Sequence, residues 1–140
     1  MNAIDTNIWI YCHDRRDSRK QKTARDLVLG VQPMGLLWQV GCEFVAAARK
    51  LEPFGFTQQM AWNALADMQA MADEVLLPDP ESWTDAEELQ SQYQLQFWDA
   101  LLLAGCVRGA VTTLYSEDFS EHEEIHGIRI VDPFDATETQ

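Results

Sequence analysis

Four acidic side chains occur at places where an α/β fold can bring them together. Asp5 ends a short apolar run, and Asp118 directly follows a stretch rich in β-branched residues that is predicted to form a strand. Glu43 lies on a helix that leaves another short strand, and Asp99 lies in the first turn of an apolar helix. The carboxyl ends of parallel strands meet at one edge of a sheet, so we expect the four carboxylates to converge there.

Crowded carboxylates repel one another, and a hard divalent cation relieves that repulsion. Mg²⁺ or Mn²⁺ held by carboxylates also activates water and neutralises phosphoryl oxygens, which is the chemistry of phosphodiester hydrolysis. Each acid has an ordinary structural explanation as well. Asp5 and Asp118 could be turn or capping residues, Asp99 an acid at a helix N-terminus, and Glu43 a partly exposed charge. It is much less expected that all four acids occupy these places for separate structural reasons than that any one of them does.

The elements that must position these acids follow from apolar periodicity and from helix and turn signals. Strands are expected at 3–4, 36–38, 74–77, 111–115 and 128–131, and helices at 18–29, 39–51, 58–72, 84–93 and 97–108. Thr57 is the predicted N-cap of the third helix, and Thr84 with Glu87 has the spacing of a capping box. Helix 97–108 is apolar nearly all round and is therefore expected to be buried. Short strands alternating with helices predict a parallel sheet covered on both faces.

Length and composition indicate one domain. The chain has 140 residues without internal repeats or a linker, so we expect a single domain over 1–135 and a polar C-terminal tail over 136–140. No run of eighteen apolar residues and no secretory signal are present, which predicts a cytoplasmic protein without a membrane span. Cys12, Cys42 and Cys106 lack metal-ligand spacing and are expected to be buried thiols rather than zinc ligands.

The net charge of −13 argues against a generally basic nucleic-acid-binding surface. Six of the ten basic residues nevertheless lie within the eleven positions 15–25. The candidates for phosphate contacts are Arg15, Arg16, Arg19 and Lys20. A solvated helix face explains this cluster at least equally well.

The stretches IDTNIWIY, CEFVAA, FWDALLLAGC and LYSEDF, in this order and spacing, resemble the PIN-domain nucleases. Within that family the chain resembles the VapC-like toxins of bacterial type II toxin–antitoxin systems, over residues 2–134. The resemblance implies a PIN fold with a five-stranded parallel sheet between helices. It also implies a metal-dependent endoribonuclease that acts on structured RNA.

Carried over by position, the resemblance assigns functional roles to six residues. It makes Asp5, Glu43, Asp99 and Asp118 the catalytic acids around Mg²⁺ or Mn²⁺. Asp5 and Asp99 would be the most direct metal ligands, and Asp118 and Glu43 would complete the site, partly through water. Asn7 and Ser116 match supporting polar positions that orient the first and the last acid. Glu117 adds a carboxylate beside Asp118 that could compete with it as the ligand.

The resemblance further implies a homodimer and a cognate antitoxin that inserts a segment into a hydrophobic groove. Met and aromatic residues suit an adaptable groove wall, although a core position explains most of them equally well. The candidates are Phe54, Phe56, Met60, Trp62, Met68 and Met71.

Two other functions remain open for this sequence. A non-catalytic PIN-like interaction module would have the same fold, but it should have lost at least one of the four acids. A dehalogenase-type phosphatase or a receiver domain also places an Asp after the first strand. The phosphatases need a second Asp where this chain has Asn7, and both classes need a late Lys, whereas no Lys follows Lys50.

Overall fold

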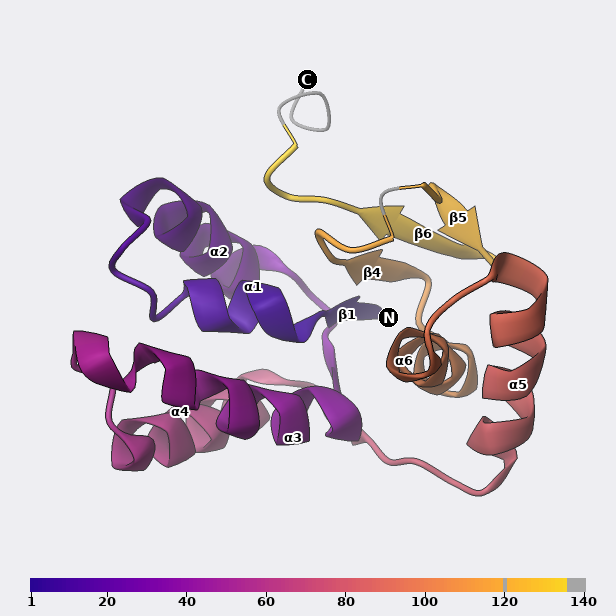
Figure 1. Cartoon of the computed structure of the whole chain (residues 1–140), viewed down its shortest axis with the longest axis horizontal. Helices are drawn as coiled ribbons and strands as arrows, with labels where there is room; N and C mark the ends of the chain where they lie inside the picture. Colours follow the sequence, from indigo (N-terminus) through magenta and orange to yellow (C-terminus); the bar gives the residue numbers. More distant parts are fainter. Residues whose placement is uncertain (120, 136–140) are drawn as a thin grey trace.

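The computed structural model describes residues 1–119 and 121–135, and the predicted tail 136–140 lies outside this part of the chain (Figure 1). One sheet contains, in spatial order, β1 (Asn2–Ile4), β4 (Thr113–Tyr115), β6 (Ile128–Val131) and β5 (Glu124–Ile125). A two-stranded sheet contains β2 (Gly35–Leu37) and β3 (Glu74–Leu76). A single parallel bridge between Asn2 and Met34 links β1 to the second sheet.

The predicted parallel arrangement of five strands is confirmed in β1, β2, β3, β4 and β6. They are divided between two sheets rather than hydrogen-bonded as one, because the link between β1 and β2 is only that bridge. A further strand, β5, pairs antiparallel with β6. It was not predicted, since two residues are too short to carry a periodic pattern.

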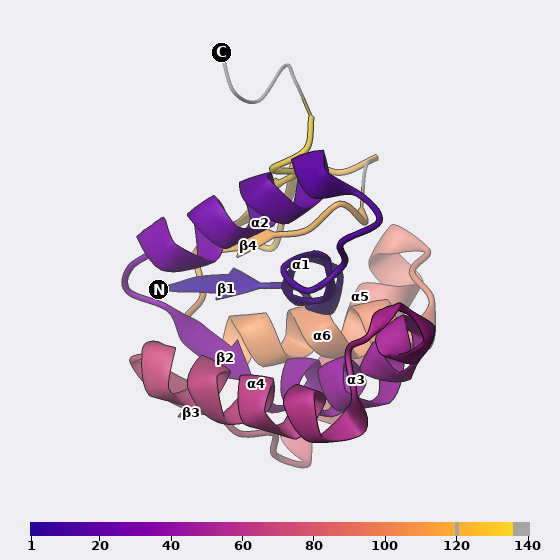
Figure 2. The ribbon, with the colours of Figure 1, turned by 90° about the vertical axis from the view of Figure 1, so that its left-hand side faces the viewer.

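The described helices are α1 (Thr6–Tyr11), α2 (Ser18–Gly30), α3 (Trp38–Ala47), α4 (Gln58–Met71), α5 (Glu81–Tyr93) and α6 (Phe97–Arg108), with the 3₁₀ helix η1 (Ala48–Phe54) between α3 and α4. Figures 1 and 2 show α2 on one side of β1 and α6 on the other, so helices cover both faces of the strands. α1 packs on α2 and α3, α3 on α4, and α5 on α6. This is the α/β class predicted from the alternation of strands and helices.

The predicted and observed boundaries of the helices agree best where a cap residue determines the start of the helix. Thr57 accepts a hydrogen bond from the Met60 amide at 3.1 Å, which confirms it as the N-cap of α4. The capping box at Thr84 is wrong, because α5 already begins at Glu81. Pro80 is the N-cap, and Asp79 Oδ1 accepts from the Glu81 amide at 2.8 Å, so the helix begins three residues before Thr84. The helix predicted to reach residue 51 instead changes from α to 3₁₀ geometry at residue 48.

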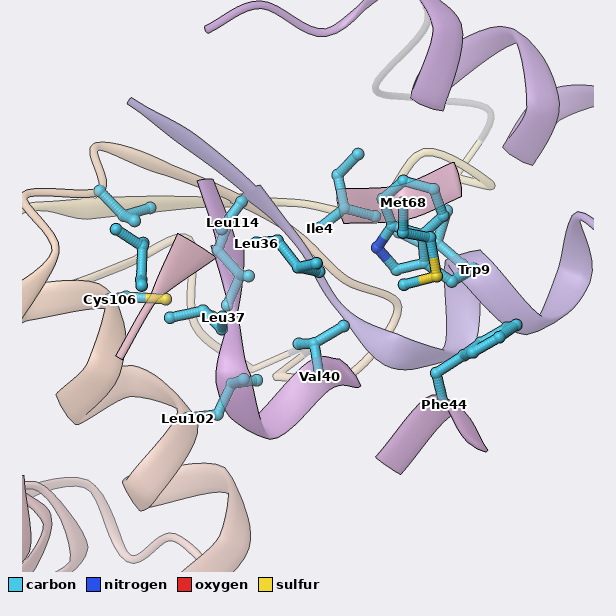
Figure 3. Close-up of a cluster of buried hydrophobic side chains, with 14 of the residues drawn as sticks. Ile4, Trp9, Leu36, Leu37, Val40, Phe44, Met68, Leu102, Cys106 and Leu114 are labelled. Atoms are coloured by element: carbon cyan, nitrogen blue, oxygen red, sulfur yellow. The ribbon is translucent and has the colours of Figure 1, made fainter. Parts of the chain in front are cut away.

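A continuous apolar core joins the two sheets to the helices. Figure 3 shows its labelled members from β1, α1, β2, α3, α4, α6 and β4: Ile4, Trp9, Leu36, Leu37, Val40, Phe44, Met68, Leu102, Cys106 and Leu114. α6 is only partly the buried helix predicted, because Trp98 at its start is 57% exposed while Leu103 is fully buried. Cys12 and Cys106 are buried as expected, but Cys42 is exposed on α3. Within the described ranges, no helix has the length and apolar character needed to cross a bilayer.

Candidate active site

The four predicted acids line one cavity of about 410 Å³ at the carboxyl ends of β1 and β4. The register of these strands explains how Asp5 comes to lie beside Ser116, two residues before Asp118. Ile4 pairs with Tyr115, and the Asp5 amide donates to the Tyr115 carbonyl at 2.9 Å, so Asp5 and Ser116 emerge side by side. α3 and the N-terminal turn of α6 bring the other acids to the same place. The other lining residues are Thr6, Asn7, Gln39, Ala46, Ala47, Trp98 and Leu102.

Asp5 is the most buried of these acids, with 5% of its surface exposed. Its Oδ1 accepts from the Thr6 amide at 2.7 Å and its Oδ2 accepts from the Ser116 hydroxyl at 2.7 Å. It therefore caps α1 and also faces the acidic cavity, so the capping explanation and the site explanation both hold geometrically. Burial raises the pKa of Asp5 to about 6, although both hydrogen bonds act in the opposite direction.

Glu43 is held by polar partners from α1 and from its own helix. Its Oε2 accepts from the Thr6 hydroxyl at 3.1 Å, and its Oε1 accepts from Gln39 Nε2 at 2.6 Å. The same Gln39 nitrogen donates to the Trp98 carbonyl at 3.0 Å, which ties α3 to the first turn of α6. Neither Thr6 nor Gln39 was predicted as a site residue. The spacing of Gln39 four residues before Glu43 on one helix face was the available signal.

Asp99 lies half-buried on the other wall of the cavity. Burial raises its pKa, and the negative charges of Asp118 and Glu43 add to that effect. Its carboxylate takes part in none of the hydrogen bonds found within residues 1–119 and 121–135. Asp99 is thus the acid of this cavity with the most freedom to accept a ligand.

Asp118 and Glu117 are neighbours in sequence but point to different surroundings. Asp118 lines the acidic cavity, where its Oδ2 accepts from Asn7 Nδ2 at 3.3 Å and its amide donates to the Ser116 hydroxyl at 3.0 Å. Glu117 accepts from the Tyr11 hydroxyl at 2.7 Å and from Lys20 Nζ at 3.1 Å. The ammonium group of Lys20 pairs with Glu117 outside the cavity, so the geometry favours Asp118 over Glu117 as the fourth acid.

The cavity concentrates negative charge. Burial raises the pKa of Asp118 above its usual range, and the nearby charges of Glu117 and Glu43 raise it further. The donors that face the cavity are carboxylate, hydroxyl and amide oxygens, which is the set that Mg²⁺ or Mn²⁺ prefers. In the described part of the chain, no three His, Cys, Asp or Glu side chains are already grouped closely enough to hold a metal ion. The donor chemistry fits such an ion, and binding would require the repelling acids to move closer together.

The four predicted basic contacts do not line this cavity, and they differ in their availability. Arg16 forms a two-pronged pair with Asp14, at 2.9 Å for each hydrogen bond, and stacks over Phe54. Lys20 is engaged with Glu117 and Tyr11. Arg15 and Arg19 are both exposed, and neither forms an ion pair within the described residues. These two arginines are consequently the freest of the predicted phosphate-binding residues.

A larger and mainly apolar groove of about 890 Å³ lies between α3, α4 and the β2–β3 pair. Trp62 lines it and is 53% exposed. The other five predicted wall residues do not line this groove. Met68 is buried in the core, and α4 packs against α3. Phe56 precedes α4 and is buried with its ring stacked on that of His13. Trp38, Val45 and Leu65 form much of the actual wall, and none of them was predicted for it. Trp38 was expected to end the strand 36–38, but it begins α3.

Comparisons with known proteins agree with this architecture. A family model described as PIN domain matches residues 3–127. A search of curated proteins found no match. Among solved structures, the chain is similar to a toxin–antitoxin complex from Klebsiella pneumoniae, with a TM-score of 0.71 and 18% identity over 96% of this chain and 99% of that one.

Two further structures share the fold. One is VapC20 from Mycobacterium tuberculosis, described as a toxin that cleaves the sarcin–ricin loop, with a TM-score of 0.69 and 18% identity over 92% of this chain and 99% of that chain. The other is VapBC-1 from nontypeable Haemophilus influenzae, with a TM-score of 0.66 and 14% identity over 96% of this chain and 98% of that chain. With the family match over residues 3–127, the fold and the acidic cavity lead to one conclusion: this chain belongs to the PIN domain family.

Proposed function

We propose that this protein is a metal-dependent endoribonuclease and the toxin of a type II toxin–antitoxin pair, acting in the cytoplasm. The observation that carries the proposal is the convergence of Asp5, Glu43, Asp99 and Asp118 on one cavity. Membership of the PIN family and the similarity of the fold to toxin structures support it. Buried acids with raised pKa values are typical of functional sites.

In this proposal Asp5, Asp99 and Asp118 hold Mg²⁺ or Mn²⁺, and Glu43 completes the set of catalytic acids. The bound ion would supply a positive charge that activates water and neutralises the oxygens of the scissile phosphate. The choice of these metals rests on the all-oxygen donor set. Zinc is disfavoured since neither His nor Cys lines the cavity.

The chain's own polar residues hold the acids in place. Ser116 supports two of them at once, because its hydroxyl donates to Asp5 and accepts from the Asp118 amide. Thr6 and Gln39 fix the two oxygens of Glu43. Asn7 donates to Asp118, the last acid, rather than to the first acid, Asp5. Such contacts already restrict the acid side chains, so these side chains lose less conformational entropy when a cation and a substrate bind.

Incubation of the purified protein with total RNA tests the proposal. Discrete cleavage products are expected with Mg²⁺ or Mn²⁺ and none with EDTA, and mapping of RNA ends would locate the cut. A protein that binds its partner but leaves RNA intact with either metal would instead be the non-catalytic interaction module. Expression without the partner should arrest growth if the protein is a toxin.

Metal binding should be visible as a gain in stability without any cleavage assay. At ten times the dissociation constant, Mn²⁺ should stabilise the folded protein by about 1.4 kcal/mol, which corresponds to roughly 3–6 °C in melting temperature. Asp99→Asn should remove most of that shift. Glu117→Gln is the matched control, since Glu117 is paired with Lys20 outside the cavity. An equal shift in wild type and Asp99→Asn would exclude Asp99 as a ligand.

The two free arginines should contribute to RNA affinity through phosphate contacts. Replacing Arg15 and Arg19 by alanine should weaken binding and reduce the slope of log affinity against log salt by about 1.4 for single-stranded RNA. Lys22→Ala is the control, because Lys22 is exposed but pairs with Asp26 at 2.8 Å. Fluorescence anisotropy at several salt concentrations measures both effects. An unchanged slope in the double variant would mean that the RNA phosphates contact other residues.

The proposed partners are a cognate antitoxin and a second copy of this chain. The apolar groove lined by Trp38 and Trp62 is of a size and character that suits an apolar segment of the antitoxin. Sedimentation of the protein alone and with the product of a neighbouring small gene tests both partners. A monomer that forms no complex with that product would contradict this part of the proposal.

A further inference from the structure

A third cavity, of about 210 Å³, directly adjoins the acidic one. The two cavities share the residues Gln39, Trp98 and Leu102. It lies between α3, the start of α5 and α6, whose arrangement Figure 1 shows, and the ends of β2 and β3 contribute Leu37 and Leu76 to its wall. Its volume is below the range typical of drug-sized ligand sites, which suits a single planar ring system rather than a whole nucleotide.

The composition of this cavity is that of a binding site for a flat, mostly apolar group. Leucines and Pro78 form most of its wall, and Trp38 and Trp98 contribute indole rings that are 54% and 57% exposed. Phe97 packs edge-on against Trp98, with ring centroids 5.0 Å apart and an interplanar angle of 72°. This contact favours one orientation of the Trp98 ring. The exposed part of the ring is then available for stacking with a second planar ring.

Two polar side chains complete the cavity. Ser82, at the start of α5, is 4% exposed and brings its hydroxyl to the wall of the cavity. Gln39 lies at the border with the acidic cavity, and its amide nitrogen is already committed to Glu43 and to the Trp98 carbonyl. A hydroxyl that can both donate and accept suits a ligand that carries hydrogen-bonding groups on an otherwise apolar ring.

We propose that this cavity binds one unpaired nucleobase of the RNA, stacked on Trp98 and hydrogen-bonded to Ser82, while the adjacent phosphodiester lies in the acidic cavity. The inference rests on the proposed function and names how its substrate is held. Stacking on aromatic side chains needs no positive charge, so it explains how a protein of net charge −13 binds RNA. It also implies a preference for single-stranded loops, whose bases are free to turn outward.

The test measures binding of labelled single-stranded pentanucleotides by anisotropy in EDTA, where no cleavage is expected. Trp98→Ala should weaken binding by about 5- to 150-fold, the range for loss of one base–aromatic stack. Trp98→Phe should keep most of the affinity. Trp83→Ala is the matched control, because Trp83 is 67% exposed on α5 but does not line this cavity. Ser82→Ala should alter the order of affinity among the four homopolymeric pentanucleotides.

Abasic probes make the test specific for a base. An abasic residue at one position of the pentanucleotide should weaken binding to the wild type and have no further effect in Trp98→Ala. Equal affinities of wild type and Trp98→Ala would overturn the subsite. It would also be overturned if Trp98→Ala dissociated a dimer while the abasic penalty persisted, since the surface would then be a protein contact. A wild type that binds none of the probes and cleaves no RNA would instead refute the proposed function itself.

Discussion

Replacement of Asp5 by asparagine should lower the rate of RNA cleavage by about 10²- to 10⁴-fold, the range for loss of a group that acts in the transition state. Asparagine keeps the size of the side chain and can still accept from the Thr6 amide, so the cap of α1 is retained. It removes the negative charge of the most buried acid of the cavity. Single-turnover cleavage with saturating Mn²⁺ measures the effect.

The control for this variant is Asp73→Asn, which also changes an acid that accepts from a backbone amide, in this case Met34 at 2.8 Å. Asp73 lies outside the acidic cavity, so cleavage by that variant should stay near the wild-type rate. Circular dichroism should show that both variants are folded. Wild-type activity in a folded Asp5→Asn protein would exclude the proposed nuclease site.

The second large effect concerns the dependence of stability on pH in metal-free protein. Asp5 has a pKa of about 6 in the folded state and 3.8 in the unfolded state, so folding favours its protonated form. The stabilising contribution of this group is complete below pH 3.8 and is lost as pH rises through 6. A shift of this size corresponds to about 3 kcal/mol in total, of which about 2 kcal/mol falls between pH 4.5 and 7.5.

Comparison with Asp5→Asn isolates this contribution from those of the other acids. Burial raises the pKa of Asp99 and Asp118 as well, whereas the hydrogen bond from Arg16 lowers the pKa of Asp14 and therefore acts in the opposite direction. Urea unfolding in EDTA should show the variant gaining about 2 kcal/mol relative to wild type as pH rises from 4.5 to 7.5. A constant difference across this range would mean that Asp5 does not titrate abnormally.

Much of the fold could be predicted from local patterns. The strands at β1, β2, β3, β4 and β6 and the helix over 97–108 follow from apolar runs and caps that act within a few residues. The prediction is wrong where a signal was misassigned, as at Thr84, where the Asp79–Pro80 pair starts the helix earlier. The extent of the single domain stays a prediction, and the family match over residues 3–127 is consistent with it.

The candidate site, too, was predicted from the sequence only in part. Residue type and topological place marked Asp5, Glu43, Asp99 and Asp118, because parallel strands and the helices that follow them bring such positions to one edge. Their distinct environments depended on long-range packing. Only the tertiary structure separates Asp118, which faces the cavity, from Glu117, which is held by Lys20 from α2. Their catalytic and metal-binding roles stay predictions.

The sequence alone determined which chemistry to expect, since clustered acids without nearby His or Cys suit a hard cation and a phosphodiester. The tertiary structure decided which side chains support those acids and which surfaces remain open. Thr6, Gln39 and Ser116 make their contacts across elements, and such contacts leave no periodic trace along the chain. Trp62 and Met68 share one helix, yet one lines a groove and the other lies in the core. That difference arises because burial depends on which neighbouring elements pack against each face of a helix, and those neighbours come from distant parts of the sequence.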